Sequence, residues 1–244
     1  MFADYQLEIL YKDEYLVCIN KPTGLLVHKS MIDRHEIYFA MKMLRDQLGG
    51  AWVYPIHRLD KPTSGVLLFA LDSHTAKLMN EQFQAHTIQK TYIAVARGYV
   101  PSSGVIEHAL REKLDKISDK DASKYKEAQE ATTEYRLLDR VEIDASVGRY
   151  EKTRYSLVEL KPQTGRKHQL RRHMKHINHH LLGDTKYGRG EHNKFVRAKY
   201  GMNRLLLHAI SLEVKHPYTE EILLFEAGLD ATFKAMFDAF GWKL

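Results

Sequence analysis

Short strand-like runs separated by turn signals are the feature that most limits how this chain can fold. The run Val66-Leu67-Leu68-Phe69-Ala70-Leu71 is continuously apolar and follows Gly65, which is typical of a buried strand. In residues 7–20, apolar and polar side chains alternate loosely around the turn-like Lys12-Asp13-Glu14, which predicts a hairpin. Further strands are predicted at residues 90–97, 132–138, 154–160, 205–214 and 221–225.

Fewer segments have helical spacing. Residues 37–48 carry apolar side chains at near-helical intervals before Gly49-Gly50, and Asp72 or Ser73 can cap a helix that runs to about His86. A basic helix is predicted from about 167 to 177, and a closing helix at the C-terminal end after Asp230. Many strands with few helices between them favour an α+β fold with a mainly antiparallel, mixed sheet and flanking helices.

The length and composition indicate an ordinary folded protein. The chain has 244 residues, 44% of them hydrophobic, so we expect residues 1–244 to form one domain or two closely packed lobes. The single cysteine, Cys18, lies in an apolar run and is predicted to be a core residue. No apolar run approaches the roughly 20 residues that cross a bilayer, and no secretory signal is present, so we expect a cytoplasmic location.

Positive charge is concentrated in one part of the chain. Residues 152–204 contain 14 Lys or Arg against Glu159, Asp184 and Glu191, a local charge of +11, whereas the whole chain carries +6. The rest of the chain is therefore mildly acidic. A directed basic surface is typical of proteins that bind a phosphate backbone, although a solvated basic face would have the same composition.

Two other segments bear on function. Residues 111–131 are dense in mixed charges and poor in large apolar residues, which predicts an exposed insertion with little core. No phosphate-cradling, glycine-rich loop of the nucleotide-binding type occurs in the sequence, so neither ATP nor a dinucleotide is expected, and we predict no cofactor.

One carboxylate stands at the entrance to the predicted buried strand. Asp60 lies in the segment His57-Arg58-Leu59-Asp60-Lys61-Pro62-Thr63-Ser64-Gly65. Proline favours an extended Lys61, and Gly65 frees the backbone just before the strand. An aspartate in this position could be a nucleophile, a general base, a metal ligand or a turn residue paired with an arginine.

The same segment resembles the HRLDxxTSG signature of the RluA branch of pseudouridine synthases. Residues 164–171, Thr-Gly-Arg-Lys-His-Gln-Leu-Arg, look like the TGRxHQ(I/L)R block of that branch, and residues 183–188 look like its GDxxYG block. Lys90-Thr91-Tyr92 and Arg204-Leu205-Leu206-Leu207-His208-Ala209 are similar to two more of its blocks. The blocks follow the order of the family over most of residues 10–225.

The resemblance implies the pseudouridine synthase fold and a cofactor-free reaction that detaches uracil from ribose, rotates it and rejoins it through carbon. It makes Asp60 the nucleophile, which attacks either the ribose or the uracil ring. Aspartate side chains are ionised at neutral pH in water and need no activating base. By family position, the arginine that pairs with Asp60 is Arg171, and Arg166 is the alternative.

The resemblance also implies residues that bind the substrate. Tyr92 would stack on the target base and handle a proton at its ring, and Leu207 or a neighbour would pack on the other side. A uridine inside a helix must first leave its stack, and Arg58 would fill the space that it leaves, with His57 near the same strand. Phosphate contacts are expected from the basic helix, including Arg166, Lys167 and His168.

The basic helix has a second interpretation. His173, His176 and His180 are spaced i, i+3, i+7 and could bind a metal, which would suit a metal-dependent hydrolase. The surrounding Lys and Arg side chains repel a divalent cation, so we predict no metal site. Phosphate contact fits the segment better.

The resemblance points to RNA as the partner, without a membrane or a nucleotide cofactor. The chain looks most like the bacterial members that modify one uridine in the T-arm stem of certain tRNAs, expected to be uridine 65, and we expect a monomer. A ribosomal-RNA synthase of the same family and a non-catalytic RNA-binding protein remain the alternatives.

Overall fold

The computed structural model describes residues 2, 5–29, 35–111 and 127–243. The chain divides into two compact units, each assembled from three stretches. Unit 1 contains residues 1–90, 110–129 and 211–228, and unit 2 contains residues 91–109, 130–210 and 229–244.

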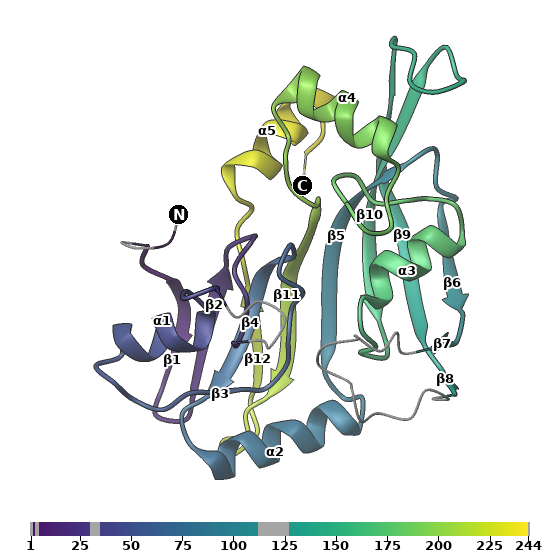
Figure 1. The fold of residues 1–244 in the computed structure, drawn as a ribbon. Coiled ribbons are helices and arrows are strands. Elements are labelled where there is room, and N and C mark those ends of the chain that lie inside the picture. Colours follow the sequence, from purple (N-terminus) through teal and green to yellow (C-terminus); the bar gives the residue numbers. More distant parts are fainter. Residues whose placement is uncertain (1, 3–4, 30–34, 112–126, 244) are drawn as a thin grey trace. The chain divides into compact units, whose positions relative to one another are not determined.

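The sheet of unit 1 begins with the predicted hairpin. Strands β1 (Glu8–Lys12), β2 (Leu16–Lys21) and β4 (Ser64–Ala70) are neighbours and pair antiparallel (Figure 1). The short β3 (Tyr54–Pro55) also pairs with β4. Next in the strand order after β4 comes β11 (Leu207–Lys215), whose last five residues, in unit 1, pair antiparallel with β12 (Ile222–Glu226).

The turn between β1 and β2 is closed by one carboxylate. Oδ1 of Asp13 accepts hydrogen bonds from the backbone N–H groups of Tyr15, at 2.7 Å, and Leu16, at 2.6 Å. Asp side chains stabilise turns in this way because they satisfy backbone donors that the sheet leaves unpaired. The predicted hairpin is therefore confirmed, and Cys18 in β2 is buried as expected.

Two helices belong to unit 1. Helix α2 (Ser73–Gln84) begins as predicted, because Oδ1 of Asp72 accepts the N–H of Thr75 at 2.8 Å, and it packs Ala76 and Met79 into the core. Helix α1 (Ala40–Gln47) begins three residues later than predicted. Phe39 is extended and Ile37 is 65% exposed, so Ile37 does not belong to the apolar face of that helix.

Unit 2 is built on long antiparallel strands. Their order is β5 (Gln89–Arg97, from Thr91 onward), β10 (Thr153–Pro162), β9 (Thr132–Ile143) and β6 (Ser103–Glu107). Helix α5 (Ala231–Phe240) packs on this sheet through buried aromatic and apolar side chains, and Asp230 caps it through the N–H of Phe233 at 2.9 Å. The predicted closing helix is thus confirmed.

Two further helices of unit 2 follow β10 (Figure 1). Helix α3 (Gln169–His176) is the predicted basic helix, but it starts two residues late because His168 adopts a left-handed conformation with φ of 57°. Helix α4 (Gly190–Tyr200) and strand β6 were not predicted. The predicted charged insertion lies mostly outside the described residues, between the paired β7 (Leu110–Arg111) and β8 (Ala128–Gln129) of unit 1.

The predicted α+β class with a mainly antiparallel sheet is confirmed, since every strand pairing described above is antiparallel. Within the described part of the chain, no helix has the length and apolar character needed to span a membrane.

Candidate active site

Asp60 lies in the connection between β3 and β4 of unit 1. Its carbonyl accepts the N–H of Thr63 at 3.0 Å, which closes a turn directly before the strand. Leu59 and Thr63 on either side are buried, whereas Asp60 itself is half-buried. The core therefore holds the neighbours of Asp60 and leaves its side chain within reach of solvent.

The backbone of this turn is held by a buried ammonium group. The side chain of Lys21 has no exposed surface, and its Nζ donates to the carbonyls of Pro22 at 2.9 Å, Leu25 at 2.8 Å and Lys61 at 3.4 Å. A buried ammonium is costly unless its donors are satisfied, and here three carbonyls accept them. Lys21 thus connects the end of β2 to the residue that follows Asp60.

The loop after Lys21 adds two more bonds to the same segment. The N–H of Gly24 donates to the carbonyl of Lys61 at 2.8 Å, and Oγ1 of Thr23 donates to the carbonyl of Pro62 at 2.8 Å. Gly24 has φ of 80°, a conformation that suits glycine. The side chain of Lys61 pairs with Glu36 at 2.7 Å. The two residues after Asp60 are consequently fixed through their backbone.

His57 has a supporting place in the fold. Its Nε2 accepts the backbone N–H of Leu68 at 3.1 Å, and its ring stacks on Phe83 with centroids 5.4 Å apart. Desolvation of the ring, together with the charge of Lys90, lowers the pKa of His57 to about 3. The imidazole is therefore neutral at physiological pH and orders β4, a role that the motif alone did not indicate.

Arg58 is exposed, in contrast to its neighbour Leu59. Burial, followed by the charge of Arg58, lowers the pKa of the half-buried His28. Arg58 thus belongs to an accessible surface of unit 1 and is within electrostatic reach of His28.

In unit 2, Arg171 forms a buried ion pair that the sequence did not predict. Its Nε and Nη2 donate to the two carboxylate oxygens of Asp184, each at 2.8 Å, and Arg171 is only 5% exposed. Burial favours the neutral carboxyl, but the hydrogen bonds and charge of Arg171 outweigh it and lower the pKa of Asp184. The bidentate geometry fixes the plane of the guanidinium.

The turn after Asp184 completes this cluster. Oδ1 of Asp184 also accepts the N–H groups of Lys186 and Tyr187, each at 2.9 Å. The hydroxyl of Tyr187 lies 2.9 Å from Nδ1 of His168, and its ring lies under the guanidinium of Arg171 at 5.2 Å. The structure therefore brings together the TGRKHQLR and GDTKYG blocks of the sequence.

Tyr92 and Leu207 are both buried. Tyr92 lies in β5, where it is the register partner of Leu160 in β10. Leu207 is the first residue of β11, and its carbonyl accepts Nη2 of Arg204 at 3.4 Å. Both candidate base-contacting residues are thus placed by regular strands.

The remaining candidates lie just before α3. The Nε of Arg166 donates to the carbonyl of Glu130 at 3.1 Å, and its backbone N–H donates to Oε1 of Gln169 at 2.9 Å. Lys167 is exposed. Arg166 thus supports the loop that leads into α3, whereas Arg171 on the helix has a carboxylate partner.

The histidines of the basic segment do not form the spaced set that a metal site requires. Helix α3 ends at His176, so His180 is not one turn further along the same face. Both ring nitrogens of His173 are engaged, with Thr133 at 3.0 Å and the carbonyl of His108 at 3.1 Å. Among the described residues, no group of three potential metal ligands is found.

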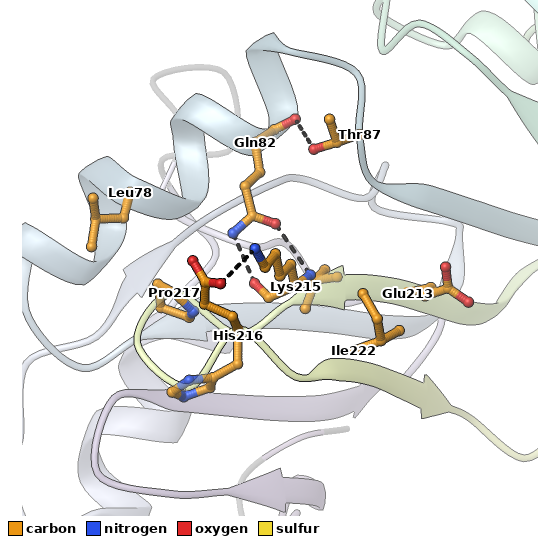
Figure 2. A pocket seen from close by; sticks show the side chains of 10 residues that line it. Leu78, Gln82, Thr87, Glu213, Lys215, His216, Pro217 and Ile222 are labelled. Atoms are coloured by element: carbon orange, nitrogen blue, oxygen red, sulfur yellow. Dashed lines mark hydrogen bonds and ion pairs between the residues drawn. The ribbon is translucent and has the colours of Figure 1, made fainter.

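A groove of about 380 Å³ lies elsewhere in unit 1, between α2 and the β11–β12 hairpin (Figure 2). The side-chain amide of Gln82 pairs with both backbone groups of Lys215, at 2.8 and 3.2 Å, and Lys215 pairs with Glu220 at 3.2 Å. These groups already satisfy one another and hold α2 on the hairpin. None of the predicted site residues lines this groove.

Lys21 and Asp184 hold candidate site residues in place, and sequence reasoning missed both. Lys21 carried no signal beyond its place before Pro22 and Gly24. Asp184 carried a signal, because an Asp at the start of a turn commonly accepts the backbone N–H groups two and three residues later.

Comparison with known proteins identifies the family of the chain. The family model for RNA pseudouridylate synthase matches residues 15–176. Proteins named tRNA pseudouridine synthase C are similar along nearly the whole chain: one from Vibrio parahaemolyticus is 52% identical over 98% of this chain and 97% of its own length, and one from Haemophilus ducreyi is 53% identical over 97% of both. The solved structure of human RNA pseudouridylate synthase domain containing 4 is 28% identical, with a TM-score of 0.71 over 97% of this chain and 94% of that chain. The resemblance read from the motifs is thereby confirmed, and the chain belongs to the RNA pseudouridylate synthase family.

Proposed function

We propose that this protein converts one uridine of tRNA to pseudouridine, with Asp60 as the nucleophile. The observation that carries the substrate class is the similarity, over 97–98% of this chain, to relatives named tRNA pseudouridine synthase C. Asp60 is favoured because it is the half-buried carboxylate of a turn whose following residues are fixed by Lys21, Thr23 and Gly24.

The proposed reaction is an isomerisation, so no atom is gained or lost. The bond between ribose and the uracil nitrogen breaks, the base rotates, and a carbon–carbon bond to ribose forms. The ring carbon releases its proton, and the freed ring nitrogen takes one up. Asp60 attacks either the ribose or the uracil ring. Because the carboxylate is the nucleophile and returns unchanged, the proposed reaction needs no cofactor.

Arg171 is the proposed cation for the Asp60 carboxylate. Its pairing with Asp184 supports this role, because a guanidinium held by two hydrogen bonds presents a fixed direction to any further acceptor. Tyr92 and Leu207 are proposed to contact the target base. Their placement in strands suits this role, since positions on regular elements vary less than those on loops.

Arg58 is proposed to occupy the space that the target uridine leaves when it flips out of its stack. Its exposure and its place two residues before Asp60 support this role. His57 would hold the same segment through its bond to Leu68 and its stacking on Phe83. Arg166, Lys167 and His168 would contact phosphates. We further propose that the target is uridine 65 of the T arm and that the protein acts as a monomer in the cytoplasm.

The test uses tRNA and ribosomal RNA from cells that lack this protein. Wild-type protein, Asp60→Asn and the exposed control Asp238→Asn are each incubated with these RNAs, and pseudouridine is mapped at nucleotide resolution. We expect one new site in tRNA with the wild type and the control, and none with Asp60→Asn, which should still bind tRNA. Product from Asp60→Asn would contradict the nucleophile, and a site confined to ribosomal RNA would favour the ribosomal alternative. No product from any variant would favour a non-catalytic RNA-binding protein.

A further inference from the structure

A pocket of about 390 Å³ in unit 2 lies apart from the residues discussed so far. Val147 and Gly148 form part of its lining. The other lining residues are three arginines, one buried histidine, one tyrosine and one glutamate: Arg97, Arg149, Arg189, His192, Tyr150 and Glu191. Arg97 ends β5, Arg149 and Tyr150 lie in the connection from β9 to β10, and Arg189 is the residue directly before α4. Three separate parts of unit 2 thus bring guanidinium groups to one concave surface.

Hydrogen bonds hold Arg97 and His192 in the lining of the pocket. The Nε of Arg97 donates to Nε2 of His192 at 3.1 Å, and Nδ1 of His192 lies 3.1 Å from the hydroxyl of Tyr155. Because arginine only donates, Nε2 is the acceptor and Nδ1 carries the proton. His192 is 5% exposed, and burial, followed by the charge of Arg97, lowers its pKa to about 4. The ring is neutral at physiological pH and serves to orient Arg97.

The part of the lining from the connection between β9 and β10 is also ordered. Nη2 of Arg149 donates to the hydroxyl of Tyr150 at 2.9 Å, and the guanidinium lies 5.0 Å from the centre of that ring. The carbonyl of Tyr150 accepts the hydroxyl of Ser146 at 3.0 Å. Arg149 is therefore positioned by its neighbour, although it is exposed.

The lining of the pocket is positive overall, because it carries three guanidinium groups against one carboxylate. Within the described part of the chain, no carboxylate forms an ion pair with Arg97, Arg149 or Arg189. Glu191 is the one acid on the wall and is exposed; the bond to its own backbone N–H at the start of α4, followed by neighbouring charges that include Arg189 and Arg97, lowers its pKa. The start of α4 adds the positive end of a helix dipole to the three guanidinium groups.

We propose that this pocket binds a backbone phosphate of the RNA substrate. Guanidinium groups match the geometry of a phosphate because their N–H donors form a planar fork, and a concave wall lets several of them reach one anion. The pocket rests on the proposed function for the identity of its ligand, and it lies outside the residues that the family motifs supply. It would position the RNA without reading its sequence.

The chain offers a charge-matched control on α4, the helix that begins directly after Arg189. Arg149→Gln with Arg189→Gln removes two exposed charges from the pocket, and Arg97 is kept because it contacts buried His192. Lys194→Gln with Arg197→Gln removes two exposed charges from α4 that do not line the pocket. Glu191→Gln removes the opposing charge.

The dissociation constant of an unmodified tRNA transcript is measured for each protein between about 50 and 200 mM salt. We expect the pocket variant to bind roughly tenfold more weakly, with a salt slope smaller by about 1, the value for one lost phosphate. The control should change little, and Glu191→Gln should bind more tightly than wild type. Equal losses in the pocket variant and the control, or wild-type binding by the pocket variant, would overturn the proposal.

Two further measurements complete the test. One separates the possible sources of the phosphate, and the other separates failure of the pocket proposal from failure of the proposed function. The transcript is compared with and without its 5′ phosphate: a backbone contact predicts the same loss on both, whereas a loss confined to the phosphorylated transcript would overturn the backbone assignment. Pseudouridine formation is assayed separately. Absence of product from the wild type, with the binding differences intact, would refute the proposed function and leave the phosphate pocket standing.

Discussion

The guanidinium of Arg171 and the carboxylate of Asp184 face each other across two hydrogen bonds of 2.8 Å, and both side chains are almost fully buried. Asp184 also accepts two backbone N–H groups from its own turn. One carboxylate therefore joins α3 to the loop that follows it. Any function of Arg171 depends on this arrangement.

Replacing Asp184 by Asn should lower the free energy of unfolding by about 3–5 kcal/mol, because it leaves the Arg171 charge buried without its partner. Urea unfolding followed by circular dichroism measures the change. Asp144→Asn is the control, since Asp144 is exposed in the same unit, and it should unfold like wild type. A loss below about 1 kcal/mol in Asp184→Asn would show that this ion pair does not stabilise the site.

Gly183 and Gly201 provide a matched pair for a steric prediction. Both have a positive φ, of 74° and 67°, but a Cβ on Gly183 would lie 1.8 Å from the carbonyl oxygen of Arg204, whereas a Cβ on Gly201 meets nothing within 4 Å. Gly201→Ala should therefore cost only about 1–2 kcal/mol of conformational strain. Gly183→Ala should cost clearly more or prevent folding. Equal unfolding midpoints for the two variants would contradict the close approach.

Buried His173 predicts how stability depends on pH. Burial lowers its pKa to about 4, whereas histidine in an unfolded chain titrates near 6.5. Between these values the unfolded state binds the extra proton, so the free energy of unfolding falls as pH decreases from about 6.5 to 4, by up to about 1.4 kcal/mol per pH unit from this group.

His173→Gln should remove part of that slope, although the variant is less stable at pH 7.5 because it loses the contacts with Thr133 and His108. Urea midpoints at pH 7.5, 6 and 5 measure the slope. His74→Gln, at an exposed position, should keep the wild-type slope. An unchanged slope in His173→Gln would mean that other groups govern the acid sensitivity.

Arg58→Ala tests the proposed role in base flipping. Extruding a stacked uridine costs a few kcal/mol, so loss of the side chain that fills the gap should slow modification of folded tRNA by about tenfold or more. An unstructured strand with the same target should be affected much less. Lys77→Ala, which also removes one exposed charge from unit 1, should affect both substrates little. Equal losses on both substrates for Arg58→Ala would contradict this role.

The elements that could be predicted are those whose ends carry their own chemistry. Asp13 closes its turn, and Asp72 and Asp230 cap their helices, all through bonds to backbone groups two or three residues away. Helix α4 was missed because it has no side-chain cap and buries only His192 and Val196, so its apolar spacing is weak. Strand β6 was missed for a similar reason, since Ile106 is its one buried residue.

The candidate site also contains residues that the sequence predicts and contacts that only the structure shows. Asp60 was identified through its motif, and the structure adds what no local pattern indicates: Lys21, some 40 residues earlier in the chain, donates to the carbonyl of Lys61. Arg171 was identified as a candidate from its motif. Its partner Asp184 is 13 residues away, and only the folded structure shows that the loop brings the two side chains together. Contacts between distant residues depend on the fold, so residue types alone do not predict them.

The three-part assembly of unit 1 has a consequence for protein synthesis. Leu212, Val214 and Phe225 pack into the same core as Leu16 and Val66, although the last of them emerges from the ribosome about 160 residues after Val66. The Asp60 segment is therefore translated long before the strands that complete its core. Until then its apolar strands lack their packing partners in the nascent chain. A chain that stalls before residue 211 would carry Asp60 and a complete HRLD motif on an incomplete sheet, and chaperones and proteases would have to clear it before it aggregates.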